Sequence, residues 1–142
     1  MKSSLNIFLF FFSCVVFSQT QAKTDKIKQI SSSDTVVFIV KTSGCFNAET
    51  IVYKLAKQKN KERLVIFIRN GKAEAKKLNA KDYGTFISCF KKSEKKFSET
   101  GDGPCTMRTE FELKNKKHSS RFTNTTCEAE FNPGDLLDQL MK

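Results

Sequence analysis

The stretch that decides the fold runs from residue 78 to residue 90 and reads LNAKDYGTFISCF. Asn79 is of a residue type that caps helix N-termini, and Asp82 stands at the third position after it, as in a capping box. The apolar side chains that follow recur at the i, i+3, i+4 and i+7 spacing of one helix face: Tyr83, Phe86, Ile87 and Phe90. The stretch therefore predicts a helix that begins after Asn79 and packs its apolar face against the rest of the protein.

The opposite face of this helix is basic. At about 100° per residue, five lysines fall on the side away from the apolar stripe, and we call them the lysine row: Lys81, Lys91, Lys92, Lys95 and Lys96. We expect the lysine row to face solvent and to be the surface that binds anions. Cys89 falls on the flank between the two faces.

Three strands are predicted before the helix. Thr35 to Thr42 (TVVFIVKT) is rich in β-branched residues and apolar on both faces, which is typical of a central strand. Glu49 to Lys57 alternates as its hairpin partner would, and Leu64 to Ile68 (LVIFI) ends at the turn pair Asn70-Gly71. The three segments predict a meander. Lysines beyond its last turn are expected to lead into the helix: Lys72, Lys76 and Lys77.

Two strands and a short helix are predicted after the long helix. Cys105 to Lys114 alternates cleanly, and Ser119 to Cys127 returns from a turn at Asn115 to His118. Pairing Phe111 opposite Phe122 keeps both rings on one face, and this register requires the four-residue loop.

The C-terminal segment repeats the start signals seen at Asn79. Asn132 is the expected cap, Pro133 the first helical residue, and Phe131 and Leu136 the hydrophobic staple. The predicted order is thus βββ-α-ββ-α. This order favours an α+β domain in which the longer helix packs on one face of an antiparallel sheet.

The first eighteen residues are typical of a secretory signal. After Lys2, an apolar run extends from Leu5 to Phe17. This run of about thirteen residues is shorter than the roughly twenty that a membrane-spanning helix needs. Small residues place cleavage after Ser18 or Ala22, so we expect no membrane span in the mature chain. The alternative is that Cys14 is a bacterial lipidation site.

One domain is expected after the signal, because the chain has 142 residues in all. Residues 19–33 are polar apart from Ile27 and Ile30, and they predict a flexible lead-in. Residues 34–142 then form the single α+β domain.

Four cysteines remain beyond the signal, an even number that predicts two disulfides in an exported protein: Cys45, Cys89, Cys105 and Cys127. A zinc site is the alternative, but no two of these cysteines are spaced as close zinc ligands are. Four cysteines allow three pairings, and the sequence does not decide among them. The Phe111/Phe122 register places Cys105 and Cys127 on opposite faces, so we favour Cys89 with Cys105 and Cys45 with Cys127.

No catalytic constellation is found in the sequence. His118 is the one histidine, and it falls in a predicted turn. Glu110 and Glu112 share a strand face, where Arg108 or Arg121 can pair with them. Nucleophile, metal, phosphate-loop and calcium-loop motifs are missing. We therefore expect a protein that is not an enzyme and uses no cofactor or metal.

The charge balance favours an anionic partner. Lys and Arg number 25 against 15 Asp and Glu, which gives a formal net charge of +10. Such a field attracts an anionic envelope or extracellular polymer, or an acidic protein. The alternative is a lysine-rich surface that serves solubility alone. Nucleic acid is not expected, because the aromatic residues occupy core positions rather than standing among the basic ones.

Short signals resemble those of small uncharacterised exported proteins of Bacteroidota-type bacteria. They are the Phe17-Ser18-Gln19 end of the leader, Ser43-Gly44-Cys45-Phe46 after the first strand, and Thr125-Thr126-Cys127 after the last. The resemblance implies a secreted or periplasmic location and no known activity. Asn124-Thr125-Thr126 also matches the N-glycosylation pattern, which has consequences only in a eukaryotic secretory route.

Two functions follow as hypotheses. The first is an exported, disulfide-stapled binding module that applies the lysine row to an anionic partner. The alternative is an inhibitor of a secreted hydrolase, in which a loop at Gly44 to Ala48 or Gly101 to Pro104 enters the cleft of the target.

Overall fold

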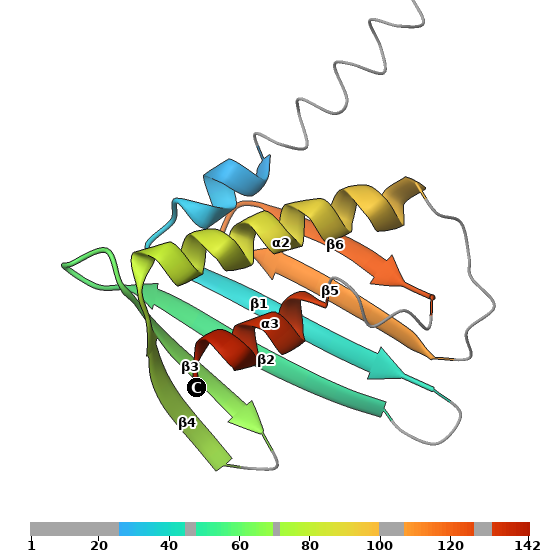
Figure 1. Cartoon of the computed structure of the whole chain (residues 1–142), viewed down its shortest axis with the longest axis horizontal. Helices are drawn as coiled ribbons and strands as arrows, with labels where there is room; N and C mark the ends of the chain where they lie inside the picture. Colours follow the sequence, from blue (N-terminus) through green and yellow to red (C-terminus); the bar gives the residue numbers. More distant parts are fainter. Residues whose placement is uncertain (1–25, 45–47, 70–71, 100–106, 127–131) are drawn as a thin grey trace, which may run out of the picture.

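One antiparallel sheet of six strands organises the chain, in the order β4-β3-β2-β1-β5-β6 (Figure 1). The computed structural model describes residues 26–44, 48–69, 72–99, 107–126 and 132–142. The strands are β1 (Thr35–Ser43), β2 (Ala48–Lys57), β3 (Arg63–Arg69), β4 (Lys72–Leu78), β5 (Arg108–Lys114) and β6 (Ser119–Asn124). Figure 1 shows the helices gathered on one side of this sheet. The α+β class and the cover by the longer helix are confirmed.

β1 is the central strand, as its sequence predicts. It pairs with β2 on one side and with β5 on the other. Val36, Phe38 and Val40 point to the helix-covered face and are buried. The aromatic core grows from Phe38, whose ring centroid lies 5.0 Å from that of Phe86 on the long helix and 5.7 Å from that of Tyr53.

The long helix α2 (Ala80–Glu99) starts where its cap predicts. Asn79 Oδ1 accepts a hydrogen bond from the Asp82 amide at 2.8 Å, and Asn79 Nδ2 donates to Asp82 Oδ2 at 2.6 Å. The apolar stripe lies on the sheet, and Phe90 meets Phe122 of β6 at 5.2 Å between ring centroids. The local start signals and the apolar spacing together fix this helix.

The short helix α3 (Pro133–Leu140) also covers the sheet (Figure 1). Asn132 caps it by accepting hydrogen bonds from the amides of Gly134 and Asp135, and Leu137 is buried. Tyr53 of β2 donates a hydrogen bond to Asp138 at 2.9 Å, which ties α3 to the sheet. The predicted cap is confirmed, and the staple residue Phe131 lies outside the described residues.

The register of the last hairpin is confirmed. Phe111 pairs with Phe122, and the loop between the strands has the four predicted residues. The two rings stack with centroids 4.9 Å apart on the covered face.

The fourth strand is a correction to the predicted order. Residues expected only to lead into α2 form β4, which pairs along its length with β3. Its sequence KAEAKKL lacks the β-branched and aromatic residues that mark strands, so propensity does not reveal it. Lysines are a common means of protecting an edge strand from pairing with another chain, and β4 is an edge of the described sheet.

The N-terminal boundary is a second correction. Residues 26–31 form a helix, and Ile27 and Ile30 are buried in the same core as Phe38. The packed part of the chain therefore begins at or before residue 26 rather than at residue 34. Of the predicted flexible lead-in, residues 19–25 lie outside the described residues.

Arg63 holds this N-terminal helix in place. Its side chain is only 3% exposed, and its guanidinium donates to the carbonyl oxygens of Ser33 at 2.7 Å, Ser31 at 2.9 Å and Asp34 at 3.1 Å. Tyr83 adds a hydrogen bond from its hydroxyl to the Ser31 carbonyl at 2.9 Å, and its ring centroid lies 4.5 Å from the guanidinium carbon. The turn after the N-terminal helix is thus fixed by two side chains from other elements.

Candidate binding surfaces

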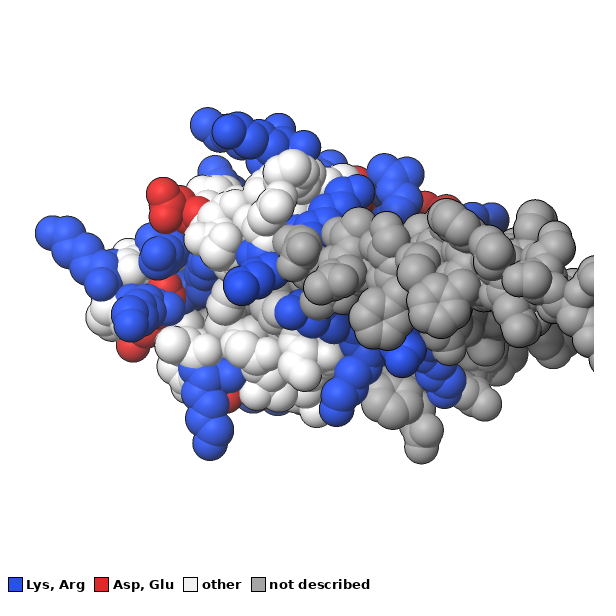
Figure 2. All heavy atoms as spheres, turned by 90° about the horizontal axis from the view of Figure 1, so that it is seen from above, with Lys and Arg blue, Asp and Glu red and all other residues white. Residues whose placement is uncertain are grey.

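The lysine row lies along the outer side of α2, away from the sheet. Lys81, Lys92 and Lys95 are exposed, whereas Lys91 and Lys96 are partly buried at the flanks. The Lys96 amino group lies 5.8 Å from the centroid of the Phe97 ring. Figure 2 shows Lys and Arg side chains spread over the visible face of the molecule, with fewer Asp and Glu side chains among them.

The described acidic side chains of α2 that lie between residues 81 and 96 are both engaged by neighbouring side chains. Asp82 is held by Asn79 in the cap. Glu94 is buried against the sheet, where it accepts a hydrogen bond from the Ser120 hydroxyl of β6. The side chain of Glu99, one turn beyond the row, is outside the description. From residue 83 to residue 96, the charged side chains on the outer face of the helix are therefore all lysines.

Cys89 sits beside the lysine row as a free thiol. It lines a shallow hollow of about 500 Å³ on the outer side of α2, together with Thr85 and Lys92. Burial raises the pKa of the thiol, against the opposing effects of a hydrogen bond from Ser93 and the charge of Lys92. The predicted bond from Cys89 to Cys105 is thus not formed in the structure.

The other predicted cysteine sites fall outside the described residues: Cys45, Cys105 and Cys127. Most of the two loops proposed for hydrolase inhibition falls there too, because residues 45–47 and 100–106 are not described.

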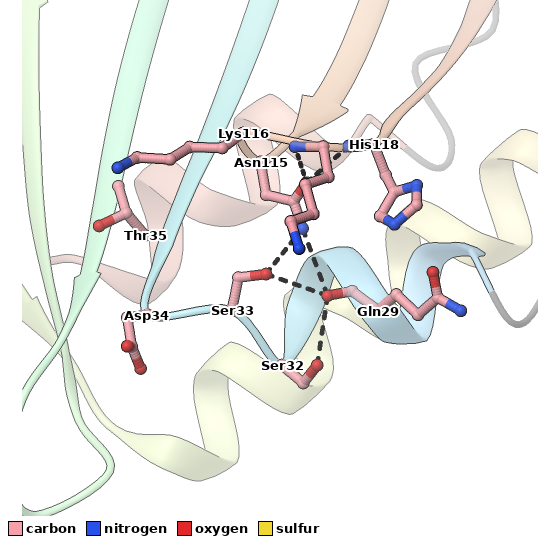
Figure 3. Close-up of a pocket in the computed structure, with 9 residues that line it drawn as sticks. Gln29, Ser32, Ser33, Asp34, Thr35, Asn115, Lys116 and His118 are labelled. Carbon is pink, nitrogen blue, oxygen red and sulfur yellow. Dashed lines mark hydrogen bonds between the residues drawn. The ribbon is translucent and has the colours of Figure 1, made fainter.

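A second candidate surface is a hollow of about 580 Å³ between the N-terminal segment and the β5–β6 turn (Figure 3). Its lining is rich in hydroxyl, amide and basic side chains: Gln29, Ser32, Ser33, Asp34, Thr35, Asn115, Lys116, Lys117 and His118. Such a lining suits a polar ligand better than an apolar one.

Asn115 fixes the shape of this hollow. Its Nδ2 donates to the Ser33 hydroxyl oxygen at 2.7 Å, which ties the hairpin turn to the N-terminal segment. Its Oδ1 accepts hydrogen bonds from the amides of Lys117 at 2.8 Å and His118 at 2.7 Å. Because Arg63 holds the opposite wall through the Ser33 and Asp34 carbonyls, both walls are fixed before any ligand arrives.

The one histidine does not meet a carboxylate in this hollow. His118 and Asp34 both line it, but Figure 3 shows them on opposite sides, with Asn115 and Ser33 between them. General acid–base catalysis needs such groups within hydrogen-bond reach of one reacting atom. The geometry is therefore that of a recess that can hold a ligand rather than that of a catalytic pair.

Sequence reasoning missed this hollow because its two walls come from segments about eighty positions apart. The only local signals were the Ile27/Ile30 spacing, which indicates a helix turn, and Asn115 at the start of a tight loop.

Charged side chains on β5 and β6 pair as their alternation predicts. Arg108 lies 3.2 Å from Glu110, and Arg121 lies 3.1 Å from Glu112. A hydrogen bond from the Ser119 hydroxyl, more than the nearby Lys114 and Arg121, holds the pKa of Glu112 below its usual value against the effect of burial. The two glutamates are thus ion-pair partners on a strand face.

Two further properties concern the described residues only. No three His, Cys, Asp or Glu side chains among them come together as metal ligands. None of their helices combines the length and the apolar character that crossing a membrane requires.

Two comparisons with known sequences found no relative. No protein-family model matches the chain, and no curated protein matches its sequence.

Proposed function

We propose that this protein is an exported binding module that holds an anionic polymer along the lysine row of α2. The observation that carries the proposal is the charge of the outer face of this helix, where the exposed charged side chains are lysines. Exposed Lys81 and Lys92 stand on it, while the Asp82 and Glu94 carboxylates are engaged elsewhere.

The length of the row favours a polymer over a single ion. Residues 81 to 96 of a helix extend about 22 Å at a rise of roughly 1.5 Å per residue. Lysine presents a mobile point charge rather than a planar fork, which suits repeated anionic groups of variable position. An acidic polysaccharide of the envelope or the extracellular space has this chemistry.

The experiment measures binding of the purified chain to polygalacturonate across a range of salt concentrations. Binding should weaken steeply with salt, because the contacts are exposed charges. The double variant Lys81→Gln/Lys92→Gln should weaken binding at least tenfold at low salt. The matched control Lys57→Gln/Lys59→Gln removes two exposed lysines at the β2–β3 turn and should change it less than threefold. Equal losses in the two variants would mean that net charge, and not the lysine row, binds the polymer.

Export and a Cys45–Cys127 disulfide belong to the same proposal. The strand register brings β1 and β6 to the same end of the sheet, since Ser43 pairs with Arg108 and Asn124 with Thr109, and the start of β5, which Cys105 precedes, lies at that end as well. Cys45 and Cys127 follow those two ends within three residues.

Intact-mass measurement on protein from the native host tests this part. The leader should be missing, and the mass should be lower by two hydrogens for each disulfide. A retained leader or four free thiols would overturn both the location and the cross-link.

A further inference from the structure

The face of the sheet opposite α2 and α3 carries exposed apolar side chains. No described element packs on this face, and Val52, Ile66 and Ile68 are 42%, 38% and 60% exposed. The register places them side by side, because Val52 pairs with Ile68. Ala75 and Ala73 of β4 pair with Ile66 and Ile68, and they continue the apolar surface to the sheet edge.

On β2, β3 and β4 the described charged side chains of this face are positive. Alternation puts two exposed lysines there, Lys54 on β2 and Lys77 on β4, whereas Lys41 of β1 pairs in the register with Glu110 of β5. Lys54 lies between Val37 and Ile66 in the register. The acidic residues of β2 and β4, Glu49 and Glu74, pair with Thr42 and Phe67 and so belong to the other face. We call Val52, Ile66, Ile68 and the two lysines Lys54 and Lys77 the apolar sheet face.

We propose that the apolar sheet face binds the surface of an anionic lipid bilayer. Aliphatic side chains that stand on one flat face can enter the boundary between headgroups and acyl chains. Lysines among them are then at the level of the lipid phosphates, where each adds about a fivefold gain in binding.

The same charges argue against a second copy of the chain as the occupant. Two such faces packed together would bring lysine against lysine and remove both from water, which is costly. A bilayer offers the opposite charge and requires no matching shape.

The surface is independent of the one assigned to the polymer. The lysine row lies on the outer side of α2, and α2 covers the other face of the sheet (Figure 1). A lipid surface and a polymer would therefore meet opposite sides of the molecule.

The experiment uses the full mature chain and sedimentation with vesicles of phosphatidylglycerol mixed with phosphatidylcholine. The chain should sediment with these vesicles and not with phosphatidylcholine alone. Lys54→Gln/Lys77→Gln should lower the partition coefficient roughly twenty-fold, and Ile66→Ser/Ile68→Ser at least tenfold. The control Lys81→Gln/Lys92→Gln, which removes the same charge from α2, should change it less than threefold.

A fluorescence variant keeps the proposal testable if the serine variant fails to fold. The chain contains no tryptophan, so Ile68→Trp introduces a single probe. Its emission should shift to the blue on phosphatidylglycerol vesicles and be quenched by brominated lipids, whereas that of Lys92→Trp should do neither.

Three outcomes would overturn the inference. They are no binding to the anionic vesicles, equal loss from the α2 control, and a dimer in solution that the Ile66→Ser/Ile68→Ser variant dissociates. Failure of this inference can be distinguished from failure of the proposed function. Binding to the polymer should depend on Lys81 and Lys92, whereas binding to the vesicles should depend on Lys54 and Lys77.

Discussion

The two faces of the sheet alternate from the same strands, yet they are built from different residues. On the covered face Phe38 touches a set of rings that includes Phe86 and Phe111. On the open face, aliphatic side chains such as Ile68 stand beside lysines. The difference teaches that alternation identifies the two faces, while the aromatic rings mark the face that the helices cover.

The largest expected effect is on the covered face. Phe38→Ala should lower the free energy of unfolding by about 4 kcal/mol, because it removes a fully buried ring and leaves a cavity. Urea denaturation followed by circular dichroism measures the change. The change Val52→Ala on the open face should cost less than about 1 kcal/mol. A loss above about 2 kcal/mol for Val52→Ala would mean that the open face is covered too.

Two arginines sharpen the same comparison. Arg63→Met removes a buried guanidinium that three backbone carbonyls share, and it should lower the free energy of unfolding by about 3 kcal/mol. Arg121→Met removes an arginine that is 74% exposed beside Glu112, and it should cost less than about 1 kcal/mol. Thermal unfolding of both variants provides the test, and an Arg121 loss as large as that of Arg63 would contradict it.

The two faces should also respond to opposite extremes of pH. Burial, only partly offset by Arg63, raises the pKa of Tyr83 to about 12 from its usual 10.0. The stability from its neutral hydroxyl is complete below pH 10 and is lost as the pH rises towards 12, on the order of 2–3 kcal/mol. Tyr83→Phe should remove this alkaline loss, which unfolding measured from pH 9 to pH 12 will show.

The pKa of Glu112 is shifted in the opposite direction to that of Tyr83. Its pKa is lowered from the usual 4.5, so its contribution to stability is present above that pH and is lost as the pH falls below it.

The Tyr83 prediction has its own contradicting outcome. An alkaline loss of stability of the same size in Tyr83→Phe and in the parent chain would contradict the assignment to Tyr83.

The smallest effect is expected at Ile68. Because its side chain is largely exposed, Ile68→Ser should change the free energy of unfolding by less than about 0.5 kcal/mol in urea. A loss above about 2 kcal/mol would show that Ile68 packs against the protein itself, and the bilayer proposal would then lose its apolar anchor.

Local chemistry explains which elements the sequence reveals. The start of α2 at Asn79, the start of α3 at Asn132 and the Phe111/Phe122 register each depend on residues close together in the chain, and all three were predicted. β4 was missed because its pairing with β3, and not its composition, makes it a strand.

The candidate surfaces divide in the same way. The lysine row follows from helix spacing alone, so its place on α2 was predictable. The hollow beside Asn115 and the hydrogen bonds of Arg63 join residues that are far apart in the sequence. The periodicity of one segment therefore does not predict them.

The place of β1 in the sheet has a consequence for synthesis. It is the first of the described strands to be made, yet one of its two neighbours is β5, and Val37 pairs with Lys114. Pairings so distant in sequence form slowly. The middle of the sheet cannot close until most of the chain has left the ribosome, so the export proposed above would meet a precursor still open enough to be threaded across a membrane.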